Sequence, residues 1–337
     1  MAPNKTNPIT LRDGMRIGTG NAESDDEFLF KCFVEHSALA AAVNPDSAGM
    51  IIAGRTGSGK TAILRAVQYK NDQQVEIDPA EMAMDYVANS DALRFVHAIG
   101  GDLNLLFQAL WKHVLCIEFI RLRYDVKNSE KSRNIFNRFA EAFLADERKK
   151  RSIEYLREWE GKFWITMDQN IKELTEEYEK KLVGEFGGEI EKFKAGGQYE
   201  KRMSAGQKSE LVARSRKIIN SDQLAKLHGV IDILSNEAAT DHLYFVLIDR
   251  LDENWVDNSI RFRMIRSLVE ALKSFRRIRN LKVLVALRTD VLERVVQETA
   301  DLSFQREKFE DYYIKMNWSK RDLRSLVDLR LIELFKR

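Results

Sequence analysis

Eight consecutive residues have the types and spacing of a loop that binds phosphate. They match the pattern G-x-x-x-x-G-K-[ST], in which glycines let backbone N–H groups approach phosphate oxygens without a Cβ clash. The lysine of such a loop reaches the β- and γ-phosphates, and its last hydroxyl is a ligand for Mg²⁺. We predict that this loop and the residue after it bind a nucleoside triphosphate: Gly54, Arg55, Thr56, Gly57, Ser58, Gly59, Lys60, Thr61 and Ala62.

The sequence around this loop has the order that phosphate binding requires. An apolar run, Met50–Ala53, precedes the glycines and is typical of a buried parallel strand. A helical pattern, Lys60–Gln68, follows them and directs the positive end of its dipole at the same anion. A chance match in a Gly-rich segment is the alternative, and this context argues against it.

A second buried strand is predicted to supply the carboxylates. The run Leu243–Ile248 ends in Asp249, which is the Walker B arrangement, and we expect Asp249 to hold Mg²⁺ together with Thr61. Asp252 and Glu253 follow, and one of them, Glu253 by preference, is predicted to polarise the attacking water. The alternative is that both acids only cap the next helix.

A third strand, Leu281–Leu287, ends in Arg288. An arginine at this position could sense the γ-phosphate or stabilise charge in the transition state. The alternative is a structural salt bridge from Arg288 to Asp249 or Asp290.

The helix predicted for Asn258–Phe275 and the residues after it are rich in cations. Such a face could contact phosphates of DNA or RNA, or ATP in a neighbouring subunit, and the alternative is a solvated surface. The net charge of +2 does not by itself indicate nucleic acid binding. The cationic residues are Arg261, Arg263, Arg266, Lys273, Arg276 and Arg277.

Composition narrows the class of protein. Of the 337 residues 44% are hydrophobic and 31% are charged, as in a soluble globular protein. Cys32 and Cys116 show no metal-ligand spacing and are read as buried thiols. Residues 1–14 lack a secretory signal, and no stretch resembles the roughly 20 apolar residues of a membrane helix, so we expect a cytoplasmic protein without a membrane partner.

The order of the elements predicts an α/β protein with a parallel sheet interrupted by a long helical insertion. Val75–Ile77 is a further predicted strand. Further helices are predicted at Asp26–Ala42, Asp91–Tyr124, from Asp290 onward, and at Ser319–Phe335 with Ser319 as N-cap. Within the insertion, apolar residues recur as in a coiled-coil arm: Ile171, Leu174, Tyr178, Leu182, Phe186, Ile190 and Phe193.

With these motifs the chain resembles the STAND/AAA-like branch of P-loop ATPases, and is most similar to the bacterial Sll1717-type P-loop ATPases. The similarity rests on short strings at both ends of the chain: Gly20–Asp26, Ile248–Trp255, Asn317–Leu323 and Leu329–Leu331. It implies that residues 20–25 border the adenine, that the C-terminal helices begin a lid, and that the nucleotide is ATP, since no guanine-reading N-K-x-D string is present. Asp249 lies 189 positions after Lys60 (249 − 60), which is a longer separation than a minimal core of this kind needs.

The fold class predicted is therefore a P-loop NTPase parallel sheet with flanking helices, a coiled-coil-like insertion and a C-terminal helical lid. The segments expected are the lead-in 1–45, the first part of the core 46–128, the helical insertion 129–238, the second part of the core 239–300 and the lid 301–337.

These features predict an Mg²⁺-dependent ATPase whose nucleotide state controls self-assembly or an effector protein. An oligomer is expected, and the resemblance adds a role in bacterial anti-phage defence. Two alternatives stay open: a nucleotide-gated binding module with little hydrolysis, and a DNA-acting ATPase that uses the Arg261–Arg277 helix. A small-molecule kinase is a weaker alternative, because the sequence shows no acceptor-site signature.

Overall fold

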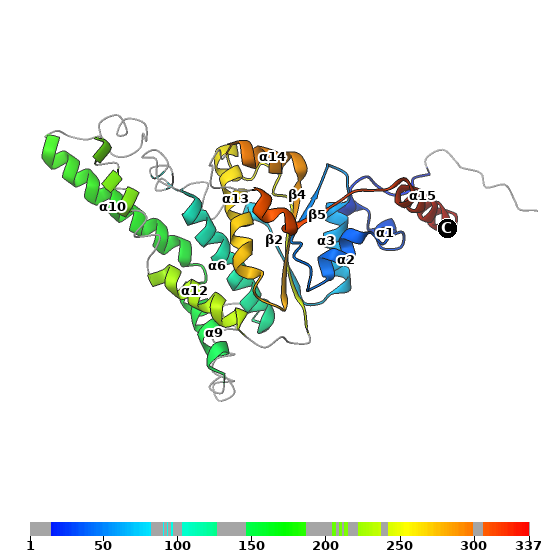
Figure 1. Cartoon of the computed structure of the whole chain (residues 1–337), viewed down its shortest axis with the longest axis horizontal. Coiled ribbons are helices and arrows are strands. Elements are labelled where there is room, and N and C mark those ends of the chain that lie inside the picture. Colours follow the sequence, from blue (N-terminus) through cyan, green and yellow to red (C-terminus); the bar gives the residue numbers. More distant parts are fainter. Residues whose placement is uncertain are drawn as a thin grey trace, which may run out of the picture.

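A computed structural model of the chain describes the greater part of its residues. The described residues are 15–81, 90, 93, 96, 103–126, 146–186, 204–206, 209–210, 212–214, 222–236, 242–298 and 306–336. They form a parallel sheet with helices on both of its faces (Figure 1).

The sheet has five strands in the order β2-β3-β4-β1-β5, and all neighbouring pairs are parallel. Its strands are β1 (Ile51–Gly54), β2 (Gln74–Ile77), β3 (Tyr244–Ile248), β4 (Leu281–Arg288) and β5 (Tyr313–Lys315). β3 and nearly all of β4 are buried, as expected of strands that helices cover on both faces. The prediction of an α/β parallel sheet is confirmed, and β4 separates the strand of the glycine-rich loop from the strand that ends at Asp249.

Side chains that alternate along each strand enter two separate cores. On one face, α2 (Ser37–Val43) and α3 (Lys60–Lys70) pack over Ile52 and Leu247. On the other face, α6 (Leu103–Arg123), α13 (Asn258–Phe275) and α14 (Thr289–Glu298) form the larger core. Figure 1 shows these two groups of helices on opposite sides of the strands.

The helical insertion leaves the sheet after β2 and returns at the neighbouring strand β3. It contains α6, α9 (Glu147–Trp159), α10 (Phe163–Phe186) and α12 (Asp222–Ser235). α6 packs along α13, α9 packs on α6, and α12 contacts both α6 and α9, while α10 extends away from the sheet (Figure 1). Of the predicted coiled-coil positions, Ile171 and Leu174 are buried. The side chains of Tyr178, Leu182 and Phe186, and all of Ile190 and Phe193, lie outside what the structure describes.

α6 corrects one expectation about hydropathy. Among the described helices it is the one long and apolar enough to cross a membrane, with a mean hydropathy of 1.3 over 18 residues, although the sequence reading found no such stretch. Its window is 67% buried inside the protein, and Trp111, Phe107 and Phe119 on it are fully buried. Such burial is what the central helix of a protein core shows, so the feature is weak evidence for a membrane segment.

The two ends of the described chain meet beside α3. The lead-in carries the 3-10 turn η1 (Ala22–Ser24) and α1 (Asp26–Leu29), and the chain ends in η2 (Arg306–Tyr312), β5 and α15 (Lys320–Phe335). The single helix predicted for Asp26–Ala42 is wrong. The chain leaves helical geometry after α1, and His36 then starts α2 as an N-cap with an extended backbone.

The prediction for α15 with Ser319 as N-cap is confirmed, and the structure adds a capping box between Ser319 and Asp322. β5 was not predicted, because three residues are too short for a pattern of alternating burial to show.

Candidate nucleotide-binding site

The predicted site residues converge at the carboxyl edge of the sheet, between β1 and β4. These strands are neighbours, and the helices that follow them, α3 and α14, pack on opposite faces. In open α/β sheets a crevice forms where adjacent strands send their next helices to opposite sides, and ligands bind there. The glycine-rich loop after β1 and Arg288 at the end of β4 face this crevice.

The loop has the backbone geometry that its glycines allow. Gly57 has φ 75° and Gly59 has φ 90°, which side chains with a Cβ rarely adopt. Gly59 is the N-cap of α3, and among the described residues no side chain caps this helix. The first N–H groups of α3 and its dipole are therefore directed at the loop, as anion binding requires.

Lys60 is folded back on the loop. Its Nζ donates to the carbonyl of Gly54 at 3.3 Å and to that of Arg55 at 3.0 Å. Burial lowers the pKa of Lys60, and the charges of Asp252 and Asp249 only partly oppose this effect. An anion beside the ammonium would therefore be favoured, since it would stabilise a charge that the protein alone has desolvated.

Thr61 and Asp249 are in direct contact beneath the loop. The hydroxyl of Thr61 lies close enough to the Asp249 carboxylate to lower its pKa, and Oδ1 of that carboxylate accepts from the backbone N–H of Arg250 at 2.8 Å. Burial raises the pKa of Asp249 in spite of these two interactions. A cation would reverse that effect, because it favours the ionised carboxylate.

These two residues fit a magnesium ion that keeps most of its ligands from water and phosphate. Mg²⁺ is commonly held by one or two protein oxygens plus the phosphates of its nucleotide. In the part of the chain that the structure describes, no group of three or more His, Cys, Asp or Glu could hold a metal alone. Ser58 adds a further fit, since its Oγ is buried without a hydrogen-bond partner among the described residues and lies in the loop itself.

Arg288 lies across the crevice and is already paired. Its guanidinium donates to both carboxylate oxygens of Asp290, at 3.0 and 2.6 Å, and to Asp252 at 3.4 Å. The alternative prediction was a salt bridge from Arg288 to Asp249 or Asp290. The structure shows the salt bridge to Asp290, and the second partner of Arg288 is Asp252 instead of Asp249. The ion pair leaves the proposed sensing role untested.

The two predicted water-activating acids occupy different positions. Asp252 is partly buried beside Arg288 and close enough to Lys60 to influence its pKa. Glu253 is exposed, and its backbone N–H donates to the carbonyl of Arg250 at 3.1 Å. The tight turn after β3 therefore places the Asp252 carboxylate beside Arg288 in the crevice and leaves the Glu253 side chain exposed to solvent.

The cationic side chains of α13 and of the residues after it do not form one continuous surface. Arg261 and Arg266 are buried, and Arg266 pairs with Glu270 at 3.1 Å. Lys273 lies over the ring of Phe309 at 4.3 Å. Arg276 lies over Tyr312, and Arg277 pairs with Asp232 at 3.3 Å. The alternative of a solvated face fits Lys273, Arg276 and Arg277, which are exposed, and is wrong for Arg261 and Arg266, so a DNA contact would have to do without these two.

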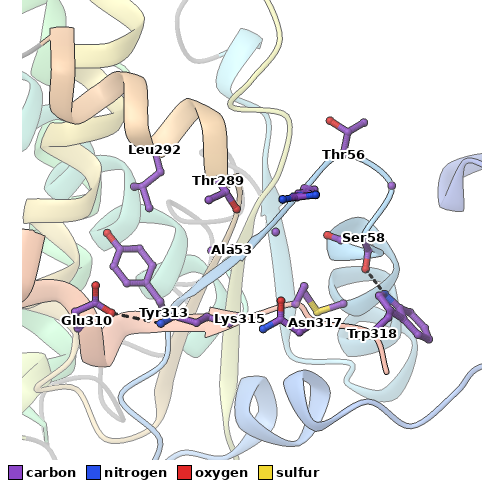
Figure 2. A pocket seen from close by; sticks show the side chains of 14 residues that line it. Ala53, Thr56, Ser58, Thr289, Leu292, Glu310, Tyr313, Lys315, Asn317 and Trp318 are labelled. Carbon is purple, nitrogen blue, oxygen red and sulfur yellow. Dashed lines mark hydrogen bonds and ion pairs between the residues drawn. The ribbon is translucent and has the colours of Figure 1, made fainter. Parts of the chain in front are cut away.

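Trp318 is a site residue that the sequence reading left without a role. Its indole Nε1 donates to the carbonyl of Ser58 in the loop at 2.7 Å (Figure 2). His36 holds Asn317, the residue before Trp318. Its ring accepts from the N–H of Ala38 through Nδ1 and therefore donates from Nε2 to the carbonyl of Asn317 at 3.0 Å. No local signal could have shown these contacts, because they join distant segments.

A cavity of about 620 Å³ opens beside the loop, between the loop, β5 and the start of α14. Figure 2 shows Thr289, Leu292 and Tyr313 on one side and Trp318 with Ser58 on the other. An exposed ion pair between Glu310 and Lys315, at 3.7 Å, also lines this cavity.

The lead-in contacts the other side of the site. Glu23 pairs with Arg250 at 3.0 Å, directly after Asp249, and Arg65 of α3 donates to the carbonyl of Ala22. Asp25 pairs with Arg330 of α15. The lead-in therefore links the turn after β3 to the C-terminal helix.

Comparisons with known proteins gave no assignment. No family model, no curated protein and no solved structure matches this chain.

Proposed function

We propose that this protein is an Mg²⁺-dependent ATPase that binds the phosphates of ATP in the loop Gly54–Thr61. The observation that carries the proposal is the contact between Thr61 and Asp249 at the start of α3. It brings together one hydroxyl and one carboxylate, the oxygen ligands that an Mg²⁺-nucleotide complex takes from such proteins.

In this proposal, different groups of the chain bind different parts of the triphosphate. Backbone N–H groups of the loop and of the first turn of α3 hold the phosphate oxygens. Lys60 exchanges its two carbonyl acceptors for the β- and γ-phosphates, and the orphaned Ser58 hydroxyl gains an acceptor. Bound Mg²⁺ would neutralise charge on the phosphates, with Thr61 and Asp249 holding it.

The turn after β3 supplies the group that polarises water. We assign this role to Glu253, whose side chain is exposed, and assign Asp252 to orienting Arg288 toward the γ-phosphate. The positions of the two side chains and the pairing of Asp252 with Arg288 support this division.

The test is phosphate release from Mg²⁺-ATP, measured beside ATP affinity. Glu253→Gln should bind ATP as the wild type does and lose turnover by about 100-fold or more, the scale of a general base. Lys60→Ala is the control that should lose binding as well. Turnover that survives in Glu253→Gln would move the role to Asp252 or remove it from this turn.

A nucleotide-gated binding module is the second candidate function. Two contacts favour it: Glu23 with Arg250 joins the proposed nucleotide site to the lead-in, which pairs with α15 through Asp25 and Arg330, and Trp318 with Ser58 joins that site to the start of α15. A wild type that binds ATP tightly and releases almost no phosphate would favour this module over the ATPase.

ATP as the nucleotide, a lid formed by the C-terminal helix, and a role in a bacterial defence assembly rest on the family resemblance alone. The expected homo-oligomer has a different basis, which is that an arginine of one subunit would complete the nucleotide site of its neighbour. Mass measurement with and without a non-hydrolysable ATP analogue would test the assembly.

A further inference from the structure

A buried arginine holds the turn that carries the two candidate catalytic acids. Arg261 lies in the first turn of α13 and is 6% exposed. Its Nη1 donates to the carbonyl of Glu253 at 2.7 Å, to Oδ1 of Asn254 at 2.7 Å and to the carbonyl of Asp252 at 3.3 Å. Its Nη2 donates to Oδ1 of Asn258 at 2.6 Å.

All four acceptors are uncharged oxygens, which is unusual for a buried guanidinium. A buried charge is costly unless it is paired and hydrogen-bonded. Burial lowers the pKa of Arg261, and the charge of Asp252 only partly compensates. The protein therefore keeps a buried cation that costs free energy of folding, and the contacts of this cation fix the backbone of one short turn.

The ends of that turn have anchors of their own. Leu251 is fully buried, Trp255 is almost fully buried, and the Trp255 indole donates to the carbonyl of Leu251 at 3.2 Å. Arg250, just before, has φ 60°, a conformation that residues with a side chain rarely adopt. Between these anchors, Asp252 to Asn254 contact Arg261 through three oxygens, so this arginine sets where the middle of the turn lies.

We infer that Arg261 is a positioning residue for hydrolysis, which acts through Glu253 and Asp252 and makes no contact with nucleotide. The inference rests on the proposed ATPase function. It also gives Arg261 a role other than the phosphate contact that its place in a cationic helix suggested.

The test compares Arg261→Lys and Arg261→Met with Arg279→Lys, a matched change at an exposed arginine that follows α13. A misplacement of about 1 Å in a catalytic group can cost about 100-fold in rate. We expect kcat to fall by about that factor in both Arg261 variants, while ATP affinity and the melting temperature stay near the wild type, and Arg279→Lys should change none of the three. Amide exchange should rise at residues 252–254 and stay unchanged in α3.

Each outcome decides between the two proposals. A wild type without ATP turnover removes the ATPase function and this inference with it. An active wild type with equally active Arg261 variants overturns the inference alone. If the Arg261 variants fail to fold, Asn254→Ala replaces them, because it removes one acceptor and keeps the buried charge. Asn254→Ala should then lower kcat severalfold at unchanged ATP affinity, and an unchanged kcat would overturn the inference.

Discussion

The hydroxyl of Thr61 lies close enough to the carboxylate of Asp249 to lower its pKa, although the two residues follow strands that are not neighbours in the sheet. β4 lies between them, so its end, Arg288, enters the same crevice. The contact depends on the order of the strands, and it can be tested through the metal.

Thr61→Ala should weaken the Mg²⁺ dependence of ATP binding, since it removes one of the two expected protein oxygens. Thr61→Ser keeps the hydroxyl and serves as the control. The measurement is ATP affinity across a titration of Mg²⁺. A loss of about tenfold corresponds to about 1.4 kcal/mol, the scale of one hydrogen bond to a charged group. Equal Mg²⁺ dependence in the two variants would argue against Thr61 as a ligand.

Trp318→Phe should lower ATP affinity by roughly two- to tenfold, because it removes the indole donor that orders the loop at Ser58. The same change should abolish most of the nucleotide-dependent shift in tryptophan fluorescence. Trp159→Phe, in the helical insertion, is the matched control and should leave both properties unchanged. A full fluorescence response in Trp318→Phe would contradict the assignment.

His113 should make stability fall as the pH falls. The ring is buried between Tyr155 and a stacked Phe163, and burial lowers its pKa to about 3 from an ordinary value of 6.5. Between these two pH values the unfolded chain binds a proton that the folded protein does not. The free energy of unfolding should therefore drop by up to about 1.4 kcal/mol per pH unit below pH 6.5.

His113→Gln separates this effect from the titration of carboxylates. The amide cannot titrate, and it can still hydrogen-bond the Tyr155 hydroxyl. Urea denaturation at several pH values is the measurement, and the variant should lose less stability on acidification than the wild type. Parallel curves for the two proteins would show that His113 does not contribute.

The pair Glu23–Arg250 should matter more for the order of the lead-in than for global stability. Both side chains are about two-fifths exposed, and such pairs contribute about 0–1 kcal/mol. Glu23→Arg should therefore barely change the melting temperature but should make residues 15–25 easier to cleave by protease. The double exchange Glu23→Arg with Arg250→Glu should restore protection, and high salt should weaken it.

How far the sequence predicts this protein depends on whether a signal is local. The signals of the loop, of the strand that ends in Asp249 and of the N-cap Ser319 each lie within a few residues, and the structure places each as expected. The motif residues meet because each of them follows a strand, and parallel strands have their carboxyl ends at the same edge of the sheet.

The rest depends on contacts that no short window contains. Trp318 reaches Ser58 from the far end of the chain, and Arg261 turns inward although its neighbours suggested a charged surface. The helix 26–42 was predicted from apolar spacing alone, and the extended His36 that divides it depends on Asn317 for its position. Each of these errors concerns a residue whose conformation is fixed by tertiary contacts.

The insertion begins and ends on adjacent strands, with Gln74 of β2 opposite Phe245 of β3. The insertion leaves β2 after Ile77 at the carboxyl edge and joins β3 at Tyr244 at the opposite edge, so it must cross the sheet, but those parts of it that do not pack on the core can change in length during evolution without altering the register of the sheet. α6 is the exception, since it packs along α13 in the main core. Relatives with the same sheet should therefore keep a helix equivalent to α6 and vary freely beyond it, which would let the same edge of the sheet serve different partners.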